Sequence, residues 1–352
     1  MHLFWNMPGP TRFLQRFRDE TAQGKSVVVR CPRVGLSNAG EAIRDYLRDC
    51  DHSCDLVEPT DGELPLQLLL RLVSFNACGL PTIDALLNSC ERGGRVFIIE
   101  GLKPMNWPAW KNFLATLNHR VRQRPAESRP ILIAVLRGPG FEDGLSEDVA
   151  LSLRDSDGVV SQTDALCLAD LLYRPGGSAL VRRIVVSAIA GLAMWDYELL
   201  RYLAGLPPST ILEPMTALKT YAHQKGWTET TPENVWEGTS GRFEGRSLLS
   251  PALSALREDQ QTIQRILWRA QVGVLLPWVE EERLLFVDGL RLGKDLDLEM
   301  METGELWAEC CNHPIVSRNQ KDRLATLRYI RNELAHRRCL SAQQILSGRF
   351  RF

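Results

Sequence analysis

The sequence has no excess of charge of either sign and contains few histidines. Its 42 lysines and arginines stand against 43 aspartates and glutamates, which gives a net charge of −1 at pH 7, and there are six histidines. A balanced charge excludes a protein that is drawn to nucleic acid by an overall basic field, so any such binding must come from a local patch.

Long apolar runs and a secretory leader are also missing from the sequence. The most apolar stretch, residues 181–206, is interrupted by charged side chains and therefore indicates a buried helix. The first ten residues, MHLFWNMPGP, lack the basic start and apolar run of a signal peptide. We therefore expect a cytoplasmic protein that has no membrane partner.

The nine cysteines do not form a recognisable metal-binding pattern. An odd number of scattered cysteines is typical of reduced thiols in the cytoplasm. Two clusters carry zinc-ligand residue types: Cys50, His52 and Cys54, and Cys310, Cys311 and His313. Neither cluster has the spacing of a CxxC knuckle, so we expect buried or surface thiols in place of a metal site, and no cofactor.

Strands and helices alternate through the first half of the chain. Compact apolar runs predict strands at residues 26–32, 93–102 and 129–140, with a weaker one at 157–162. Helical patterns occupy residues 11–25, 41–50, 64–78, 107–124 and 163–174. This alternation predicts a parallel sheet with helices on both of its faces.

The phosphate-binding motifs that such a sheet often carries are absent. The tripeptide Gly24-Lys25-Ser26 precedes the first strand, whereas a Walker A loop follows a strand. The segment in the right place, CPRVGLSNAG, has Gly35 and Ser37, but Leu36 stands where the phosphate-binding lysine is expected. The second apolar strand ends in Glu100 and then glycine, so one of the two usual carboxylates is missing.

The order of these elements, through about residue 172, resembles the AAA+/STAND class of P-loop ATPases with the catalytic groups lost. This resemblance implies a degenerate P-loop-like α/β domain over residues 1–175 and a helical lid over residues 176–225. Residues 226–249, rich in Gly, Thr and Glu, are predicted to be a linker or extended arm. ATP hydrolysis is not expected, because no lysine meets the β- and γ-phosphates.

Residues 250–352 are predicted to form a helical bundle. Ser250 and Pro251 have the residue types of an N-cap and a first helical position. A following helix is expected to break or kink at Pro277. Two further helical patterns, residues 297–313 and 319–338, complete about four antiparallel helices.

The last of these helices carries a motif with catalytic residue types. It reads Arg331-Asn332-x-x-Ala335-His336, and the preceding helix carries E-x-G-x-L at Glu302, Gly304 and Leu306. A bundle with these two patterns resembles the HEPN domains that are fused to ATPase or nuclease partners in bacterial anti-phage defence. The resemblance covers about 100 residues. It implies that the bundle is a metal-independent endoribonuclease whose active site is formed by two subunits of a dimer.

The resemblance implies a role for each residue of the motif. His336 would move a proton at the 2′-OH or at the leaving oxygen, and Arg331 would stabilise the charge on the scissile phosphate. Asn332 would orient His336 or a phosphate oxygen, and the products would be a 2′,3′-cyclic phosphate and a 5′-OH. The neighbouring Arg328, Arg337 and Arg338 would contact the RNA backbone.

Helix geometry places limits on this site. Leu324, Leu327, Ile330 and Leu334 form one apolar stripe, and Arg331 lies about 140° around the helix from His336. A single helix therefore does not bring the two together, but two copies facing across a two-fold axis could.

Two functions stay open at this point. One is a prokaryotic defence-type protein whose bundle forms a homodimer and cuts RNA, while the sheet domain senses or docks a partner. The other is a non-catalytic scaffold in a hetero-complex with other defence subunits, since an Arg, an amide and a His near a helix end can also serve as caps.

Overall fold

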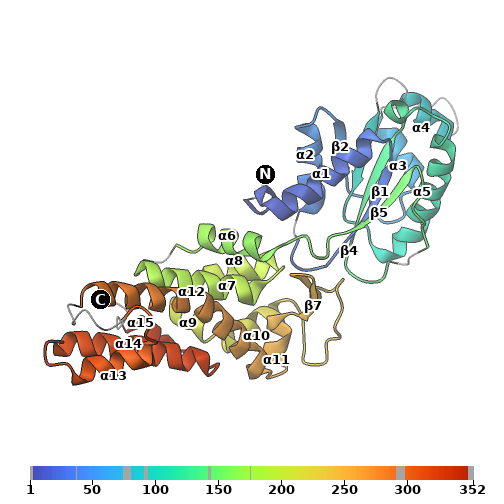
Figure 1. Cartoon of the computed structure of the whole chain (residues 1–352). Helices are drawn as coiled ribbons and strands as arrows, with labels where there is room; N and C mark the ends of the chain where they lie inside the picture. Colours follow the sequence, from blue (N-terminus) through green and yellow to red (C-terminus); the bar gives the residue numbers. More distant parts are fainter. Residues whose placement is uncertain are drawn as a thin grey trace. The chain divides into compact units, whose positions relative to one another are not determined.

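Five parallel strands form the sheet that the sequence predicts, in the order β2-β3-β4-β1-β5 (Figure 1). The protein is described from a computed structural model that covers residues 3–36, 38–73, 81–90, 94–141, 144–174, 176–290 and 298–347. The strands are β1 (Ser26–Cys31), β2 (Ser53–Val57), β3 (Arg95–Ile99), β4 (Ile131–Arg137) and β5 (Leu151–Asp155).

Helices cover both faces of this sheet (Figure 1). On one face, α3 (Pro65–Leu72), α4 (Ile83–Ser89) and α5 (Trp107–Val121) bury a core that includes Trp107, Trp110, Phe97 and Leu132. On the other face lie α1 (Pro8–Ala22) and α2 (Ala39–Arg48), which contact each other and the central strands. The mixed α/β class is thus confirmed.

The three central strands fall where the apolar runs predict them, and the predicted strand at residues 157–162 is wrong. The fifth strand is Leu151–Asp155, and a turn at Gly158 follows it. A further strand, β2, is not predicted at all. Both β2 and β5 are edge strands that bury fewer of their residues than β1, β3 and β4, so their apolar runs are short.

The chain forms two units that are not continuous in sequence. The sheet unit contains residues 1–164, 195–198 and 232–250, and the helical unit contains 165–194, 199–231 and 251–352. The segment expected to be a linker includes the hairpin of β6 (Ser240–Phe243) and β7 (Arg246–Leu249), which belongs to the sheet unit. The four-part division by residue number stays a prediction.

The remaining helices make up the helical unit (Figure 1). They are α7 (Ala179–Ala193), α9 (Pro208–Leu212), α10 (Met215–Gln224), α11 (Pro251–Leu256), α12 (Gln260–Asp288), α13 (Thr303–Asn312), α14 (Arg318–Ala335) and α15 (Ala342–Leu346). Two more, α6 (Gln162–Leu172) and α8 (Tyr197–Ala204), cross the boundary between the units.

The long helix α12 organises the helical unit. It packs against both α7 and α14, and α13 packs against α14. The helix does not break at Pro277, because α12 runs as one helix of 29 residues through this proline. A kink at this position stays a prediction. No helix among the described residues is long and apolar enough to cross a bilayer.

Candidate functional site

Two places in the fold could carry function, and the first is the carboxyl edge of the sheet. Strands β1 and β4 are neighbours, but the chain leaves β1 toward β2 and leaves β4 toward β5. Ligands of open α/β sheets bind at such a topological switch point. The strand ends Cys31 and Arg137 are register partners there, so the nucleotide position of a P-loop fold is expected beside them.

An arginine side chain occupies this position. The Nη2 of Arg137 donates to Oε1 of Glu100 at 3.1 Å, and its Nη1 donates to the carbonyl of Leu36. Leu36 is the residue that stands in place of the phosphate lysine, and Glu100 is the remaining carboxylate. A guanidinium therefore balances the carboxylate that in a working ATPase would hold Mg²⁺.

The hollow formed by the described residues of the loop after β1 is too small for a nucleotide. A hollow lined by Gly35, Leu36, Trp195 and the β6 residues Ser240 and Gly241 has a volume of about 10 Å³. One water needs a space of about 10–15 Å³, and small-molecule sites measure roughly 300–1,000 Å³. The other loop residue of interest, Ser37, lies outside the described residues.

Glycine and cysteine at this edge have structural roles. A Cβ on Gly40 would lie 2.4 Å from Oε2 of Glu100, so only glycine lets this carboxylate approach the start of α2. Burial raises the pKa of the Cys31 thiol above its usual range. A thiol that stays protonated is a poor nucleophile, so Cys31 belongs to the packing of the edge.

The second place is the helix α14 with the RNxxAH motif. Its first turn is fixed by a capping box between Ser317 and Gln320. The predicted apolar stripe is confirmed, because Leu324, Leu327, Ile330 and Leu334 are all buried. The helix ends at Ala335, and His336 is its C-cap, with its backbone N–H donating to the carbonyl of Asn332 at 3.0 Å.

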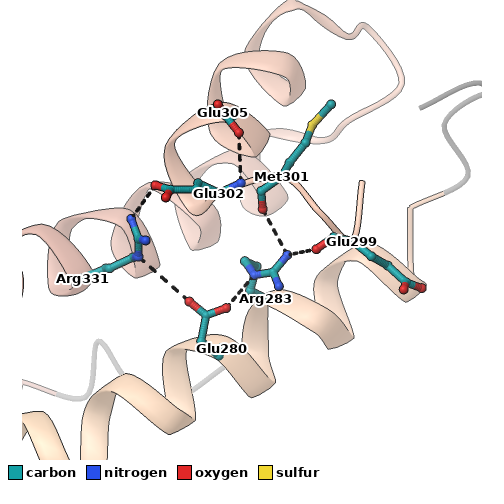
Figure 2. Close-up of polar contacts among 7 residues, drawn as sticks. All are labelled: Glu280, Arg283, Glu299, Met301, Glu302, Glu305 and Arg331. Carbon is teal, nitrogen blue, oxygen red and sulfur yellow. Dashed lines mark hydrogen bonds and ion pairs between the residues drawn. The ribbon is translucent and has the colours of Figure 1, made fainter. Parts of the chain in front are cut away.

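Arg331 points into a network of charged side chains on α12 and α13, as Figure 2 shows. Its Nη1 lies 3.1 Å from Oε2 of Glu302, and its Nε lies 4.0 Å from Oε1 of Glu280. Two carboxylates thus neutralise the guanidinium that the sequence assigns to a phosphate.

Arg283 completes the network from the next turn of α12 (Figure 2). Its Nε donates to Glu280 at 2.7 Å, and its Nη1 donates to the carbonyls of Glu299 and Met301 at 2.9 and 3.2 Å. The Arg283 side chain is only 12% exposed. The network therefore ties the segment before α13 to α12 and to α14.

The other residues of the motif lie apart from this network. Asn332 and His336 are exposed, and among the described residues no hydrogen bond or ion pair joins either side chain to Arg331. The expected separation of Arg331 and His336 along one helix agrees with this arrangement. Whether these residues form a catalytic site stays a prediction.

The three expected RNA-binding arginines have different surroundings. Arg328 lies over the ring of Trp307, 4.5 Å from its centroid, and beside Gly304. Arg338 pairs with Glu333 at 3.4 Å. Arg337 adopts a left-handed backbone with φ of +58° and is exposed. Of the three, Arg337 alone is directed at a basic cavity, whose other arginines, on α12, the sequence analysis missed.

The cysteine clusters do not gather ligands. Cys50, His52 and Cys54 lie in the sheet unit, and burial raises the pKa of Cys54 to about 11. Cys310, Cys311 and His313 lie in the helical unit, where burial also raises the pKa of Cys310. Over the described ranges, no group of three or more metal-ligand side chains comes together.

The sequence matches no family model, and no curated protein matches it either. Among solved structures, one that is similar is the Orc1 protein of Aeropyrum pernix in complex with DNA, at 16% identity and a TM-score of 0.35. That alignment covers 94% of this chain and 84% of that chain. A likeness of this degree carries no functional argument.

Proposed function

We propose that the helical unit is a HEPN-type RNA-cleaving module of a prokaryotic defence protein and that the sheet unit is a docking module that works without nucleotide. The contact between the two sequence patterns carries this proposal. Glu302 pairs with Arg331, Gly304 lies beside Arg328, and Leu306 is fully buried in the unit. The E-x-G-x-L and RNxxAH patterns, which start 29 residues apart, are thus in contact in the fold, as a shared function requires.

The chemistry proposed for this element needs no metal. A histidine from one chain takes the proton of a ribose 2′-OH, and the 2′-oxygen attacks the adjacent phosphorus. The bond from phosphorus to the 5′-oxygen breaks, and a second histidine donates the proton that this oxygen needs. Two copies of His336 supply the base and the acid, which is why the proposal includes a dimer. His336 is exposed at the helix end, where RNA can reach it.

Arg331 has a different role in this proposal from the one its sequence suggests. Since Glu302 and Glu280 hold its guanidinium, its direct contribution to phosphate binding is opposed by two negative charges. We assign it as a positioning residue that fixes α14 on α12 and α13. Its ion pairs are largely exposed, so they stabilise the fold by about 0–1 kcal/mol.

Cleavage of a fluorescently labelled single-stranded RNA by the full chain, with EDTA present, tests the proposal. His336→Ala is expected to reduce the rate by about 10²–10⁴-fold, the usual contribution of a general acid or base. The matched control is His223→Ala, because His223 is also exposed and also lies at the C-terminal end of a helix. The control is expected to cut RNA normally, and both variants should keep the melting temperature.

A non-catalytic adaptor is the second candidate, and the neutralised Arg331 favours it. Purified dimer that leaves RNA intact with or without EDTA would exclude cleavage by this chain and support the adaptor. Cleavage that stops when EDTA is added would exclude the metal-free mechanism. Equal loss of activity in the His336 and His223 variants would show that the effect is not specific to the motif.

A further inference from the structure

A polar cavity of about 480 Å³ lies on the helical unit beside the end of α14. It is lined by Gln261, Gln264, Arg265, Trp268, Arg269 and Arg337. Three of the six lining side chains are permanently charged guanidiniums, and no carboxylate is among them. The cavity is therefore a concentrated positive charge on a protein whose total charge is −1.

The spacing along α12 explains why these side chains gather. Gln261, Arg265 and Arg269 are four residues apart, so they line one face of the helix. Gln264 and Trp268 form the adjacent row. This face begins directly after Asp259, whose side chain caps the helix by accepting from the backbone of Thr262 at 3.0 Å.

The third arginine, Arg337, comes from the segment after α14, and that segment is fixed to α12. The indole Nε1 of Trp268 donates to the carbonyl of Leu334 at 2.8 Å. The amide of Gln271, which is 1% exposed, donates to the carbonyl of Leu340 at 3.0 Å and accepts from its N–H at 2.8 Å. Hydrogen bonds on both sides of Arg337, of which the two to Gln271 are buried, therefore hold it opposite the arginines of α12.

Few acidic groups offset this charge. Asp259 interacts electrostatically with Arg265, and Glu333, the nearest acid in sequence to Arg337, is engaged by Arg338. Arg269 and Arg337 have no ion pair with a carboxylate of the described residues. Three guanidiniums that repel one another around a hollow are stabilised by an anion, and their planar forks suit the paired oxygens of a phosphate.

We propose that this cavity binds the phosphodiester backbone of single-stranded RNA. The cavity volume lies in the range of small-molecule sites and is larger than a single water-sized ion needs. The cavity is also open to solvent, so a chain can continue past it. Arg337 is the neighbour of His336, so a strand held by the three arginines passes the histidine. The choice of RNA rests on the proposed function, whereas the anion site itself rests on the three arginines alone.

Binding of a fluorescein-labelled single-stranded RNA, measured by anisotropy over a range of salt concentrations, tests this site. For single strands, the slope of log K against log [salt] falls by about 0.7 for each phosphate contact that is lost. The double variant Arg265→Ala/Arg269→Ala is expected to bind at least about 10-fold more weakly and to lose about 1.4 from this slope.

Two controls separate this site from general charge and from catalysis. Arg318→Ala removes an arginine of the same unit that is 94% exposed and far along α14 from the cavity, and it is expected to leave RNA binding unchanged. His336→Ala is expected to bind RNA as the native protein does. If the native protein binds RNA through these arginines but does not cut it, the proposed catalysis is rejected and the anion site stays intact.

Three results would overturn the proposed site. The first is a double variant that keeps the native melting temperature and binds RNA with the same affinity and the same salt slope as the native protein. Another is an equal loss of affinity in Arg318→Ala, which would mean that only total charge matters. If the double variant unfolds, the charge-retaining Arg265→Lys/Arg269→Lys replaces it, and native affinity in that variant would exclude the bidentate contacts that the site requires.

Discussion

The guanidinium of Arg137 lies 3.1 Å from the carboxylate of Glu100, at the point where the carboxyl ends of β4 and β3 meet. Both side chains are largely buried, with exposures of 27% and 19%. The pair neutralises the Glu100 carboxylate with a cation that belongs to the chain itself. Four consequences of these and other contacts can be measured.

Loss of the Arg137 side chain is expected to destabilise the sheet unit. In Arg137→Ala the Glu100 carboxylate and the Leu36 carbonyl lose their donor, which costs about 1–3 kcal/mol for a part-buried group. Urea denaturation followed by circular dichroism measures this change. The matched control is Lys103→Ala, which breaks the exposed pair with Asp61 and should cost less than about 1 kcal/mol. Equal losses in the two variants would contradict a special role for Arg137.

ATP with Mg²⁺ is expected to leave the melting temperature unchanged. A ligand at a hundred times its Kd stabilises the folded protein by about 2.7 kcal/mol, a shift that thermal denaturation detects readily. Since Arg137 is bonded to Leu36 and the hollow beside this loop measures only about 10 Å³, millimolar ATP should give no such shift. A clear rise in melting temperature would show that the edge opens to nucleotide.

Two glycine substitutions should act in opposite directions. Gly40→Ala places a Cβ 2.4 Å from the Glu100 carboxylate, and the resulting overpacking should cost about 1–3 kcal/mol. Gly273→Ala, in the interior of α12, meets nothing within 4 Å and should stabilise the helix by about 0.5–1 kcal/mol. Unfolding free energies from denaturant titration check both, and a stabilised Gly40→Ala protein would be inconsistent with the described contact.

The cap of α12 should make the helical unit sensitive to acid. The hydrogen bond from the Thr262 side chain, followed by that from its backbone, lowers the pKa of Asp259 below its ordinary value. Because the folded pKa is the lower one, this stabilisation is complete above about pH 4 and is lost as the pH falls through the folded pKa.

Asp259→Ala is therefore expected to lose about 1 kcal/mol at pH 7 and to differ little from the native protein at acidic pH. Asp259→Asn keeps a cap acceptor but cannot titrate, so it should lie close to the native protein at pH 7. Helix content followed during urea denaturation at both pH values measures the difference. A loss that is the same at all pH values would exclude the carboxylate as its cause.

The sequence predicts the centre of the sheet better than its edges. Strands β1, β3 and β4 are covered on both faces and read as continuous apolar runs such as Val27–Val29. The edge strands β2 and β5 bury fewer residues, so SCDLV is not recognised and LSLRD is displaced to a neighbouring segment. The apolar pattern reports burial, and edge strands have less of it.

Polar contacts between residues far apart in the sequence could not be predicted, for a different reason. The apolar stripe on α14 follows from local spacing. One partner of Arg331, Glu280, lies 51 positions away on another helix. Arg265 and Arg269 line a cavity only because the fold brings Arg337 to them. A cation's role depends on which charges surround it, and that depends on the fold.

The interleaving of the two units has a consequence for how the protein is made. The sheet unit takes its hairpin from residues 232–250, and the helical unit already begins at residue 165. During synthesis, the first five strands leave the ribosome well before the hairpin that packs beside the β1–α2 loop. The sheet unit is therefore completed only after part of the helical unit exists, so a fragment cut at residue 175 should be a substrate for chaperones rather than a domain.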